Sequence, residues 1–144
     1  MKNLDVMYSS KSDEWTTPDD FFKELDKEFN FNLDAAASDE NHKCSNYFTM
    51  QQDGLTQNWG GCRVFINPPY SQIDKWVAKA FYETKQDNTL VVMLIPSRTD
   101  TRYFHNYIYG RTEIRFVKGR LKFGDGKNIA PFPSMLVIFR GPGV

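Results

Sequence analysis

Two uninterrupted apolar runs, each ended by proline, constrain this chain more than any other feature. Residues 64–66 stop at the Pro-containing segment 67–69, and residues 90–95, within a strand expected from Thr89 to Ile95, stop at Pro96. Strands that are apolar without alternation are typical of a parallel sheet whose two faces are both covered by helices. Proline ends such a strand because it lacks the backbone N–H that pairing requires. The sequence therefore predicts an α/β sheet with ligands at the carboxyl ends of its strands.

Two amphipathic segments supply helices that can cover this sheet. The first is predicted to begin with Thr17 as N-cap and Pro18 in its first turn, and its apolar stripe is Phe21, Phe22, Leu25 and Phe29. The second is predicted to begin with Ser71 as N-cap and Asp74 three residues later. Its buried face is expected to be Ile73, Trp76, Val77, Ala80 and Phe81.

Shorter strand signals complete the pattern. Their residues are 31–34, 113–117, 121–123 and 134–139, and residues 100–109 indicate a short helix. Strands and helices alternate at first, whereas the last three strands have no helix between them. This order predicts an open, mostly parallel sheet that finishes in an antiparallel meander. We expect residues 1–144 to form a single domain, with residues 1–12 loosely ordered.

Several classes of protein are excluded by simple features. No apolar run approaches the ~20 residues that cross a bilayer, and the first residues lack the apolar stretch of a signal peptide, so a cytoplasmic protein is expected. Cys44 and Cys62 form no CxxC pair and are expected to be buried free thiols. His42 and His105 have no second ligand at metal-binding spacing, so no metal is expected.

The net charge is zero, but the two parts of the chain differ sharply. Residues 1–60 hold 5 Lys and no Arg against 12 acidic residues, a net charge of −7. Residues 61–144 hold 13 Lys and Arg against 6 acidic residues, a net charge of +7. One reading is a surface that faces nucleic acid, and the other is two solvated faces that happen to differ.

The tetrapeptide Asn67-Pro68-Pro69-Tyr70 carries the strongest chemical signal. An aromatic amine is a poor nucleophile because its lone pair is delocalised into the ring. Two acceptors aimed at the amino hydrogens would favour a pyramidal nitrogen, and the Asn67 side-chain carbonyl and the Pro68 backbone carbonyl can supply them. The prolines fix the backbone, and Tyr70 offers a flat face for a flipped base. The alternative is a rigid strand-to-helix turn without chemistry.

The tetrapeptide resembles the [DNS]PP[YFW] motif of amino-methyltransferases, and the chain from about Trp15 to Arg140 resembles the phage-type DNA N-6-adenine methyltransferase family. The other segments that carry the resemblance are Trp15-Thr16-Thr17-Pro18, Leu33-Asp34-Ala35-Ala36, Asp53-Gly54-Leu55, Ile95-Pro96-Ser97-Arg98-Thr99-Asp100 and Gly119-Arg120-Leu121-Lys122-Phe123. The resemblance implies a Rossmann-like, S-adenosylmethionine-dependent methyltransferase fold. It also implies site-specific methyl transfer to the N-6 amino group of adenine in DNA, with S-adenosylhomocysteine as product and Asn67, Pro68, Pro69 and Tyr70 as catalytic residues.

The resemblance also implies cofactor-binding residues, namely Thr16, Thr17, Pro18, Asp34, Ala35, Ala36 and Asp53. A helix N-terminus can receive the carboxylate of the cofactor, and small side chains let the backbone approach it. The loop after the first strand departs from the family pattern, because alanines replace the usual glycines. An Asp-Gly turn explains Asp53 almost as well as a contact with the cofactor's adenine, and Asp39 and Glu40 are candidates for holding the ribose.

A basic segment is predicted to contact DNA phosphates, and its residues are Arg98, Arg111, Arg115, Lys118, Arg120 and Lys122, with Phe123 as a stacking partner. Alternation along a strand would place Lys118, Arg120 and Lys122 on one face. Such contacts give affinity without sequence choice. An ordinary solvated strand face is the alternative.

The expected partner is therefore DNA, with adenine flipped from the duplex, in the cytoplasm of a bacterial host if the chain is phage-encoded. No separate target-recognition domain and no membrane contact are predicted, and a homo-oligomer is compatible with the sequence. Two alternatives stay open. One is methylation of another amine or amide, such as an RNA base or a protein glutamine. The other is a nucleic-acid-binding protein that has lost catalysis.

Overall fold

A computed structural model describes residues 16–124 and 128–144 of the chain. Residues 1–12, for which the sequence predicts loose order, lie outside this part. Five strands form the main sheet in the order β1 (Leu33–Asp34), β2 (Arg63–Ile66), β3 (Leu90–Pro96), β7 (Ser134–Arg140) and β4 (Glu113–Phe116). β1, β2 and β3 run parallel, and β7 is antiparallel to both of its neighbours. The predicted α/β class with a mostly parallel sheet is confirmed.

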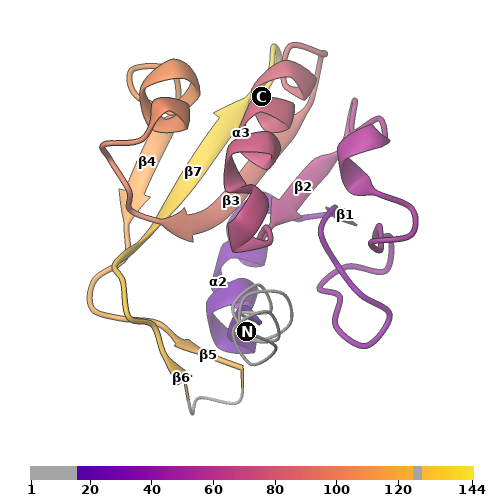
Figure 1. The fold of residues 1–144 in the computed structure, drawn as a ribbon. Helices are drawn as coiled ribbons and strands as arrows, with labels where there is room; N and C mark the ends of the chain where they lie inside the picture. Colours follow the sequence, from indigo (N-terminus) through magenta and orange to yellow (C-terminus); the bar gives the residue numbers. More distant parts are fainter. Residues whose placement is uncertain (1–15, 125–127) are drawn as a thin grey trace.

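Helices cover both faces of this sheet, as its apolar strands require. α3 (Ile73–Glu83) packs against alternate residues of β3 such as Val91 and Met93, and Figure 1 shows it in front of the sheet. α2 (Asp19–Phe29) packs on the opposite face against Val92 and Leu94. Because successive side chains of β3 point to opposite faces of the sheet, this strand contributes to two separate hydrophobic cores.

Both helices begin later than the sequence predicts. α2 starts at Asp19 after Pro18, and α3 starts at Ile73 after a short 3-10 turn, η3 (Tyr70–Gln72). Neither helix has a side-chain cap, so the N-cap roles expected for Thr17 and Ser71 are wrong. Thr17 instead uses its hydroxyl in a long-range hydrogen bond, described below.

The predicted antiparallel meander is also corrected. β7 does not lie beyond β4 but between β3 and β4, and six of its seven residues are buried, as in a central strand whose two faces are covered. β4, whose residues are at most half-buried, takes the edge. β5 (Lys122–Phe123) and β6 (Asn128–Ile129) form a separate two-stranded ribbon, at the lower left of Figure 1.

One edge of the sheet collects the chain segments that the sequence marks as functional. We call it the carboxyl edge, where β1, β2 and β3 end and β7 begins. Ser97, after β3, donates its N–H to Pro133 O at 2.9 Å, and Val117, after β4, donates to Ser134 O at 3.0 Å. The segments that follow β1, β2, β3 and β4 therefore all leave the sheet at this edge, as parallel strands require.

Candidate functional site

The tetrapeptide forms the turn from β2 into α3. Pro68 is buried and Asn67 is partly buried. Pro69 adopts an extended conformation, with ψ of 133°, before the 3-10 turn begins at Tyr70. Two adjacent prolines cannot continue the strand pairing, and each restricts the residue before it. The sequence thus forces an abrupt exit from β2 at the carboxyl edge.

Asn67 is tied to a segment fifty residues earlier in the chain. Its Nδ2 donates a hydrogen bond to Thr17 Oγ1 at 3.0 Å, across a sequence separation of 50. Thr17 is only 3% exposed. The structure thus joins the predicted catalytic tetrapeptide to the predicted cofactor segment Thr16-Thr17-Pro18.

Tyr70 lies in an aromatic cluster that sequence reasoning missed. Its ring packs edge-to-face on Phe132, with centroids 5.3 Å apart and an interplanar angle of 74°. Burial raises the pKa of the Tyr70 phenol well above its usual value, and the nearby Arg98 charge partly opposes this. Tyr70 is therefore neutral at physiological pH. One feature of the sequence could have identified Phe132: it is a large apolar residue between two prolines, Pro131 and Pro133, in a segment expected to be a loop.

The loop after β1 is organised by Asp34. This carboxyl group is 5% exposed, and its Oδ2 accepts the backbone N–H of Lys43 at 2.8 Å. Burial raises its pKa, while the backbone N–H groups of Lys43 and Ala36 act in the opposite direction. Asp34 therefore holds residues 35–43 in a closed loop at the carboxyl edge.

Asp53 lies close to this loop, but its side chain serves its own turn. Asp53 Oδ1 accepts the N–H of Leu55 at 3.2 Å. The following Gly54 packs so tightly on the loop that an added Cβ would lie 2.2 Å from the backbone oxygen of Ala35. The glycine is required for this close approach. The close packing of Gly54 on Ala35 thus also places the neighbouring Asp53 near the loop after β1.

Thr16 connects two further segments to the site. Its Oγ1 accepts a hydrogen bond from Asn41 Nδ2 at 3.1 Å, and its carbonyl accepts the N–H of Gly124 at 3.0 Å. Asn41 belongs to the loop closed by Asp34, and Gly124 follows β5. Residues from four distant parts of the sequence thus meet around Thr16 and Thr17.

The predicted basic strip does not form one strand face. β4 ends at Phe116, and the chain turns at Gly119, which has a φ of 75°. Lys118, Arg120 and Lys122 are all exposed, but only Lys122 lies in a strand. The expectation that alternation aligns these three side chains is therefore wrong.

Three other members of the strip either contact groups within the chain or lie apart from these cations. Arg115 pairs with Glu28, with both oxygens at 2.7 Å, and with Glu113. Arg111 precedes β4, and its guanidinium lies 5.8 Å from the Phe81 ring, at the edge opposite the tetrapeptide. Phe123 is 2% exposed in the core under α2. Its burial contradicts the stacking role that the sequence suggested.

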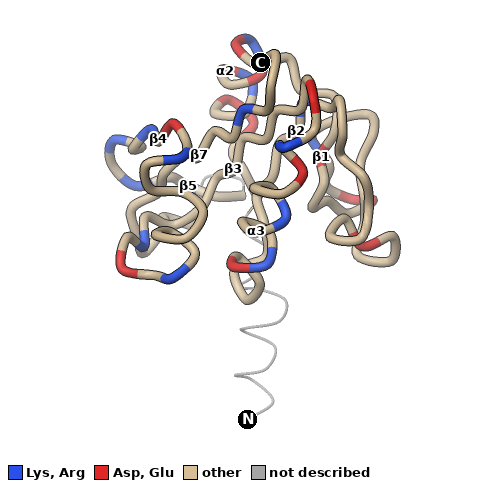
Figure 2. The backbone as a smooth tube through the Cα atoms, turned by 90° about the horizontal axis from the view of Figure 1, so that it is seen from above, with Lys and Arg blue, Asp and Glu red and all other residues tan. Residues whose placement is uncertain are grey.

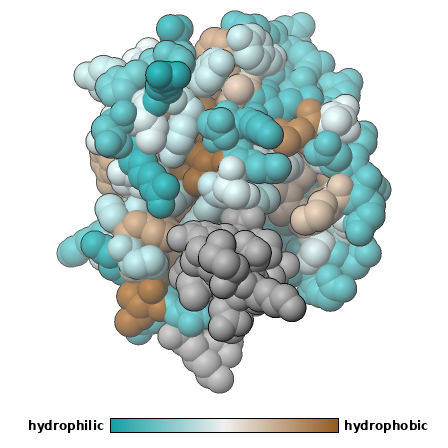
Figure 3. All heavy atoms as spheres, in the orientation of Figure 1, coloured by the Kyte–Doolittle hydropathy of each residue, from teal (hydrophilic) through white to brown (hydrophobic). Residues whose placement is uncertain are grey.

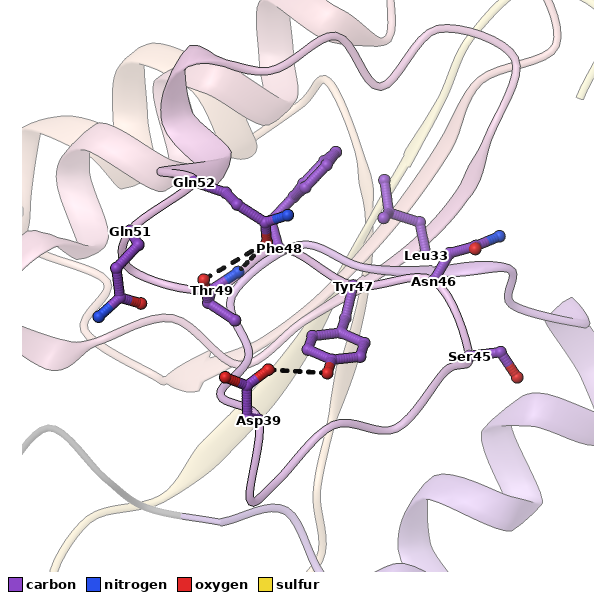
Figure 4. A pocket seen from close by; sticks show the side chains of 9 residues that line it. All are labelled: Leu33, Asp39, Ser45, Asn46, Tyr47, Phe48, Thr49, Gln51 and Gln52. Atoms are coloured by element: carbon purple, nitrogen blue, oxygen red, sulfur yellow. Dashed lines mark hydrogen bonds between the residues drawn. The ribbon is translucent and has the colours of Figure 1, made fainter.

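Two open hollows flank the loop after β1. One, of about 720 Å³, is shown in Figure 4 and lies beside β1, where Tyr47 pairs with Asp34. In it, Tyr47 OH donates to Asp39 Oδ1 at 2.8 Å, which places the ribose candidate Asp39 in the wall. The other, of about 510 Å³, lies between α2 and residues 40–43. Neither is lined by the tetrapeptide.

The remaining expectations concern thiols, metals and membranes. Cys44 and Cys62 are free and partly buried, and burial raises the pKa of Cys44 to about 12. Within residues 16–124 and 128–144, no cluster of three or more His, Cys, Asp or Glu side chains is placed to hold a metal. The same residues contain no helix that is long and apolar enough to span a bilayer.

Known proteins resemble this chain over most of its length. Residues 6–141 match the model of the family described as DNA N-6-adenine-methyltransferase (Dam). The DNA N-6-adenine-methyltransferase of Haemophilus phage HP1 is 33% identical over 138 residues, which cover 90% of this chain and 80% of that protein. The protein of the same name from Escherichia phage T1 is 33% identical over 111 residues, 76% of this chain and 46% of its own length.

Proposed function

The chain belongs to the DNA N-6-adenine-methyltransferase (Dam) family, and on this premise we propose that it transfers a methyl group from S-adenosylmethionine to the N-6 amino group of adenine in DNA. The observation that carries the assignment is the hydrogen bond from Asn67 to Thr17. It joins the segment expected to act on the amine to the segment expected to hold the cofactor. Since the substrate is DNA and both relatives are phage proteins, we place the activity in a bacterial cytoplasm.

The sheet supports a Rossmann-like methyltransferase fold. Its strands run in the order β1-β2-β3-β7-β4, and only β7 runs opposite to the other four strands. Ligands of such open sheets bind at the carboxyl ends of the parallel strands. Both predicted functional segments, after β1 and after β2, are at that edge.

The residues after β1 fit a bound S-adenosylmethionine. Ala36 is partly exposed and presents only a methyl group, so a ligand can approach the main chain at this residue, whereas Ala35 is buried beneath Gly54. Asp34 supplies a carboxylate beside this backbone for the cofactor's ammonium group. When bound, S-adenosylmethionine supplies the methyl group on a positively charged sulfur.

The tetrapeptide supplies the chemistry at the adenine amino group. Asn67 Oδ1 and the Pro68 carbonyl accept its two hydrogens, which favours the pyramidal nitrogen that attacks the methyl carbon as the carbon–sulfur bond breaks. Methyl transfer is a direct displacement, so alignment of the nitrogen contributes most of the rate. The proton that the product nitrogen loses passes to water.

Tyr70 receives the flipped base. Its ring is fixed by the edge-to-face contact with Phe132, and its phenol stays neutral because burial raises the pKa. A base taken from the duplex is commonly held by stacking on such a ring. The hydroxyl is not required for stacking.

We propose that a basic surface near this position binds DNA, and we define it as Arg98, Lys118, Arg120 and Lys122. Arg98 and Lys118 follow residues that leave the sheet on either side of the start of β7, and Figure 2 shows both basic and acidic positions where β4 and β5 lie. The loop before β7 carries Phe132, the contact of Tyr70. Phosphate contacts here would bring the duplex next to the tetrapeptide.

Apolar surface adjoins this basic surface. Phe116 is 67% exposed and Ile129 is 62% exposed, and Figure 3 shows apolar side chains at the lower left, over the β5–β6 ribbon. A two-stranded ribbon can enter the major groove of DNA. We therefore place the DNA over β5, β6 and the basic surface.

The cofactor assignment makes a direct prediction for Asp34. Asp34→Asn retains an oxygen that can accept the Lys43 N–H but removes the negative charge. We expect the Kd for S-adenosylmethionine to rise roughly tenfold or more, the scale of one hydrogen bond to a charged group. Calorimetric titration of the folded variant with S-adenosylmethionine measures this Kd.

Asp87→Asn is the matched control, because Asp87 is exposed at the opposite edge, just before β3. Its Kd should equal that of the parent protein. Equal Kd values for the parent, Asp34→Asn and Asp87→Asn would remove Asp34 from the cofactor site.

The function itself is tested in cells. The chain is expressed in a bacterial strain without adenine methylation, and the DNA is sequenced with a method that detects methylated adenine. We expect methylated adenine at one recurring short sequence, and much less of it in cells that hold an equal amount of the Asn67→Ala variant. Folded protein without methylated adenine in the DNA would refute the assignment.

A further inference from the structure

Thr17 occupies an unusual position for a threonine that precedes a helix. It is 3% exposed, and it does not cap α2, which begins at Asp19 without a side-chain cap. Its hydroxyl accepts the hydrogen bond from Asn67 Nδ2 at 3.0 Å. A buried hydroxyl thus contacts the side chain that the proposed function places at the adenine amino group.

The orientation of the Asn67 amide decides whether this side chain helps or hinders the reaction. An asparagine amide presents an acceptor oxygen on one side and two N–H donors on the other. Its terminal torsion is broad and nearly two-fold, so both orientations are sterically accessible. Only one of them points Oδ1 at the amino hydrogens. The reverse orientation would place N–H donors against N–H donors.

We propose that Thr17 is a positioning residue for Asn67, which fixes the amide by accepting from Nδ2 so that Oδ1 is directed away from Thr17 and towards the adenine amino group. This inference rests on the proposed function. It gives Thr17 a role in the chemical step that is separate from cofactor binding.

The backbone around Thr17 is held firmly enough for such a role. On one side, Thr16 accepts hydrogen bonds from Asn41 Nδ2 at 3.1 Å and from Gly124 N at 3.0 Å. On the other side, Pro18 has its φ fixed near −59°, and its carbonyl accepts the N–H of Phe22 at 3.0 Å. Preorganised supports of this kind keep a reacting geometry within the narrow limits that catalysis needs.

The test compares Thr17→Val with Thr17→Ser. Valine keeps the branched shape and removes the hydroxyl, whereas serine keeps the hydroxyl and removes a methyl group. The measurement is single-turnover methylation of unmethylated plasmid DNA at saturating tritiated S-adenosylmethionine, with rates per folded molecule from melting curves. We expect Thr17→Val to lower the rate roughly 10- to 100-fold, the scale of a small misalignment, and Thr17→Ser to recover most of it.

Two further measurements separate positioning from cofactor contact and from a purely structural role. The calorimetric Kd for S-adenosylmethionine should change less than about twofold in Thr17→Val, since an effect on alignment leaves binding intact. Adding Thr17→Val to Asn67→Ala should cost little more than Asn67→Ala alone, because a residue that acts through another is not additive with it.

The outcomes also separate this inference from the proposed function. A parent protein that methylates no DNA refutes the proposed function. A parent that is active beside an equally fast Thr17→Val refutes the inference alone, as does a variant that only weakens cofactor binding. If valine prevents folding, Thr17→Ala against Thr17→Ser gives the same comparison, and serine no faster than alanine overturns the inference.

Discussion

Replacement of Asn67 with alanine should slow methyl transfer by roughly a hundredfold or more, the scale seen when one preorganised transition-state hydrogen bond is removed. The side chain accepts a hydrogen of the adenine amino group in our account, and no other group at the tetrapeptide can replace its oxygen. The fold and the cofactor affinity of the Asn67→Ala variant should stay close to those of the parent. The measurement is single-turnover methylation beside a melting curve.

A purely architectural role for the tetrapeptide predicts a different pattern. Loss of the Asn67–Thr17 hydrogen bond lowers the free energy of unfolding by about 1 kcal/mol in either case, but with a purely architectural role the activity would follow the amount of folded protein. Tyr70→Phe is the control within the same turn. It should retain substantial turnover because stacking needs the ring. An Asn67→Ala variant as fast as the parent per folded molecule would remove Asn67 from the chemistry.

Replacing Lys118, Arg120 and Lys122 together with alanine should weaken DNA binding and flatten its dependence on salt. Each phosphate contact contributes about 0.9 to the slope of log affinity against log salt concentration. Three contacts therefore predict a slope smaller by about 2.7. Fluorescence anisotropy with a labelled duplex at several salt concentrations measures this slope.

A variant of equal charge change supplies the control for that experiment. Lys27, Lys85 and Arg111 are exposed cations at the opposite edge of the sheet. Their joint replacement with alanine should leave the slope within about 0.5 of the parent value if contact, not net charge, sets it. Equal losses in both triple variants would mean that net charge alone attracts DNA. An unchanged slope in the first would place the interface elsewhere.

The sequence predicted those parts of the fold that depend on local patterns. Unbroken apolar runs identified β2 and β3, and prolines marked where they end. The carboxyl ends of adjacent parallel strands must lie together. The sequence therefore predicts Asp34 and Asn67 at the same edge of the sheet, and β1 and β2 are neighbours in the structure.

What the sequence did not reveal depends on long-range contacts. β7 lies between β3 and β4. Which strand takes the central position depends on how helices and loops cover the two faces of the sheet, and the composition of a strand alone does not determine this. The contact between Asn67 and Thr17 spans 50 residues. Thr17 looked like a helix cap because cap and contact need the same small hydroxyl. Phe132 gave only a weak signal between its prolines.

Counting the charges of the basic segment in the sequence overestimates how many of its residues can contact DNA. Arg115 is as basic as its neighbours in the sequence, but Glu28 on α2 reaches it from across the chain with two hydrogen bonds of 2.7 Å. Phe123 looked exposed beside lysine and glycine, yet it anchors the β5–β6 ribbon in the core. Only the partners provided by tertiary structure separate cations that pair internally from those that can meet phosphates.

The central claim is that this chain methylates the N-6 amino group of adenine in DNA. Its most direct test uses purified protein, tritiated S-adenosylmethionine and unmethylated duplex DNA, followed by digestion to nucleosides and chromatography. We predict that the label migrates with N-6-methyldeoxyadenosine and appears there roughly a hundredfold more slowly when Asn67→Ala replaces the parent. Label in another nucleoside, or none from protein that is folded and binds the cofactor, would contradict the account.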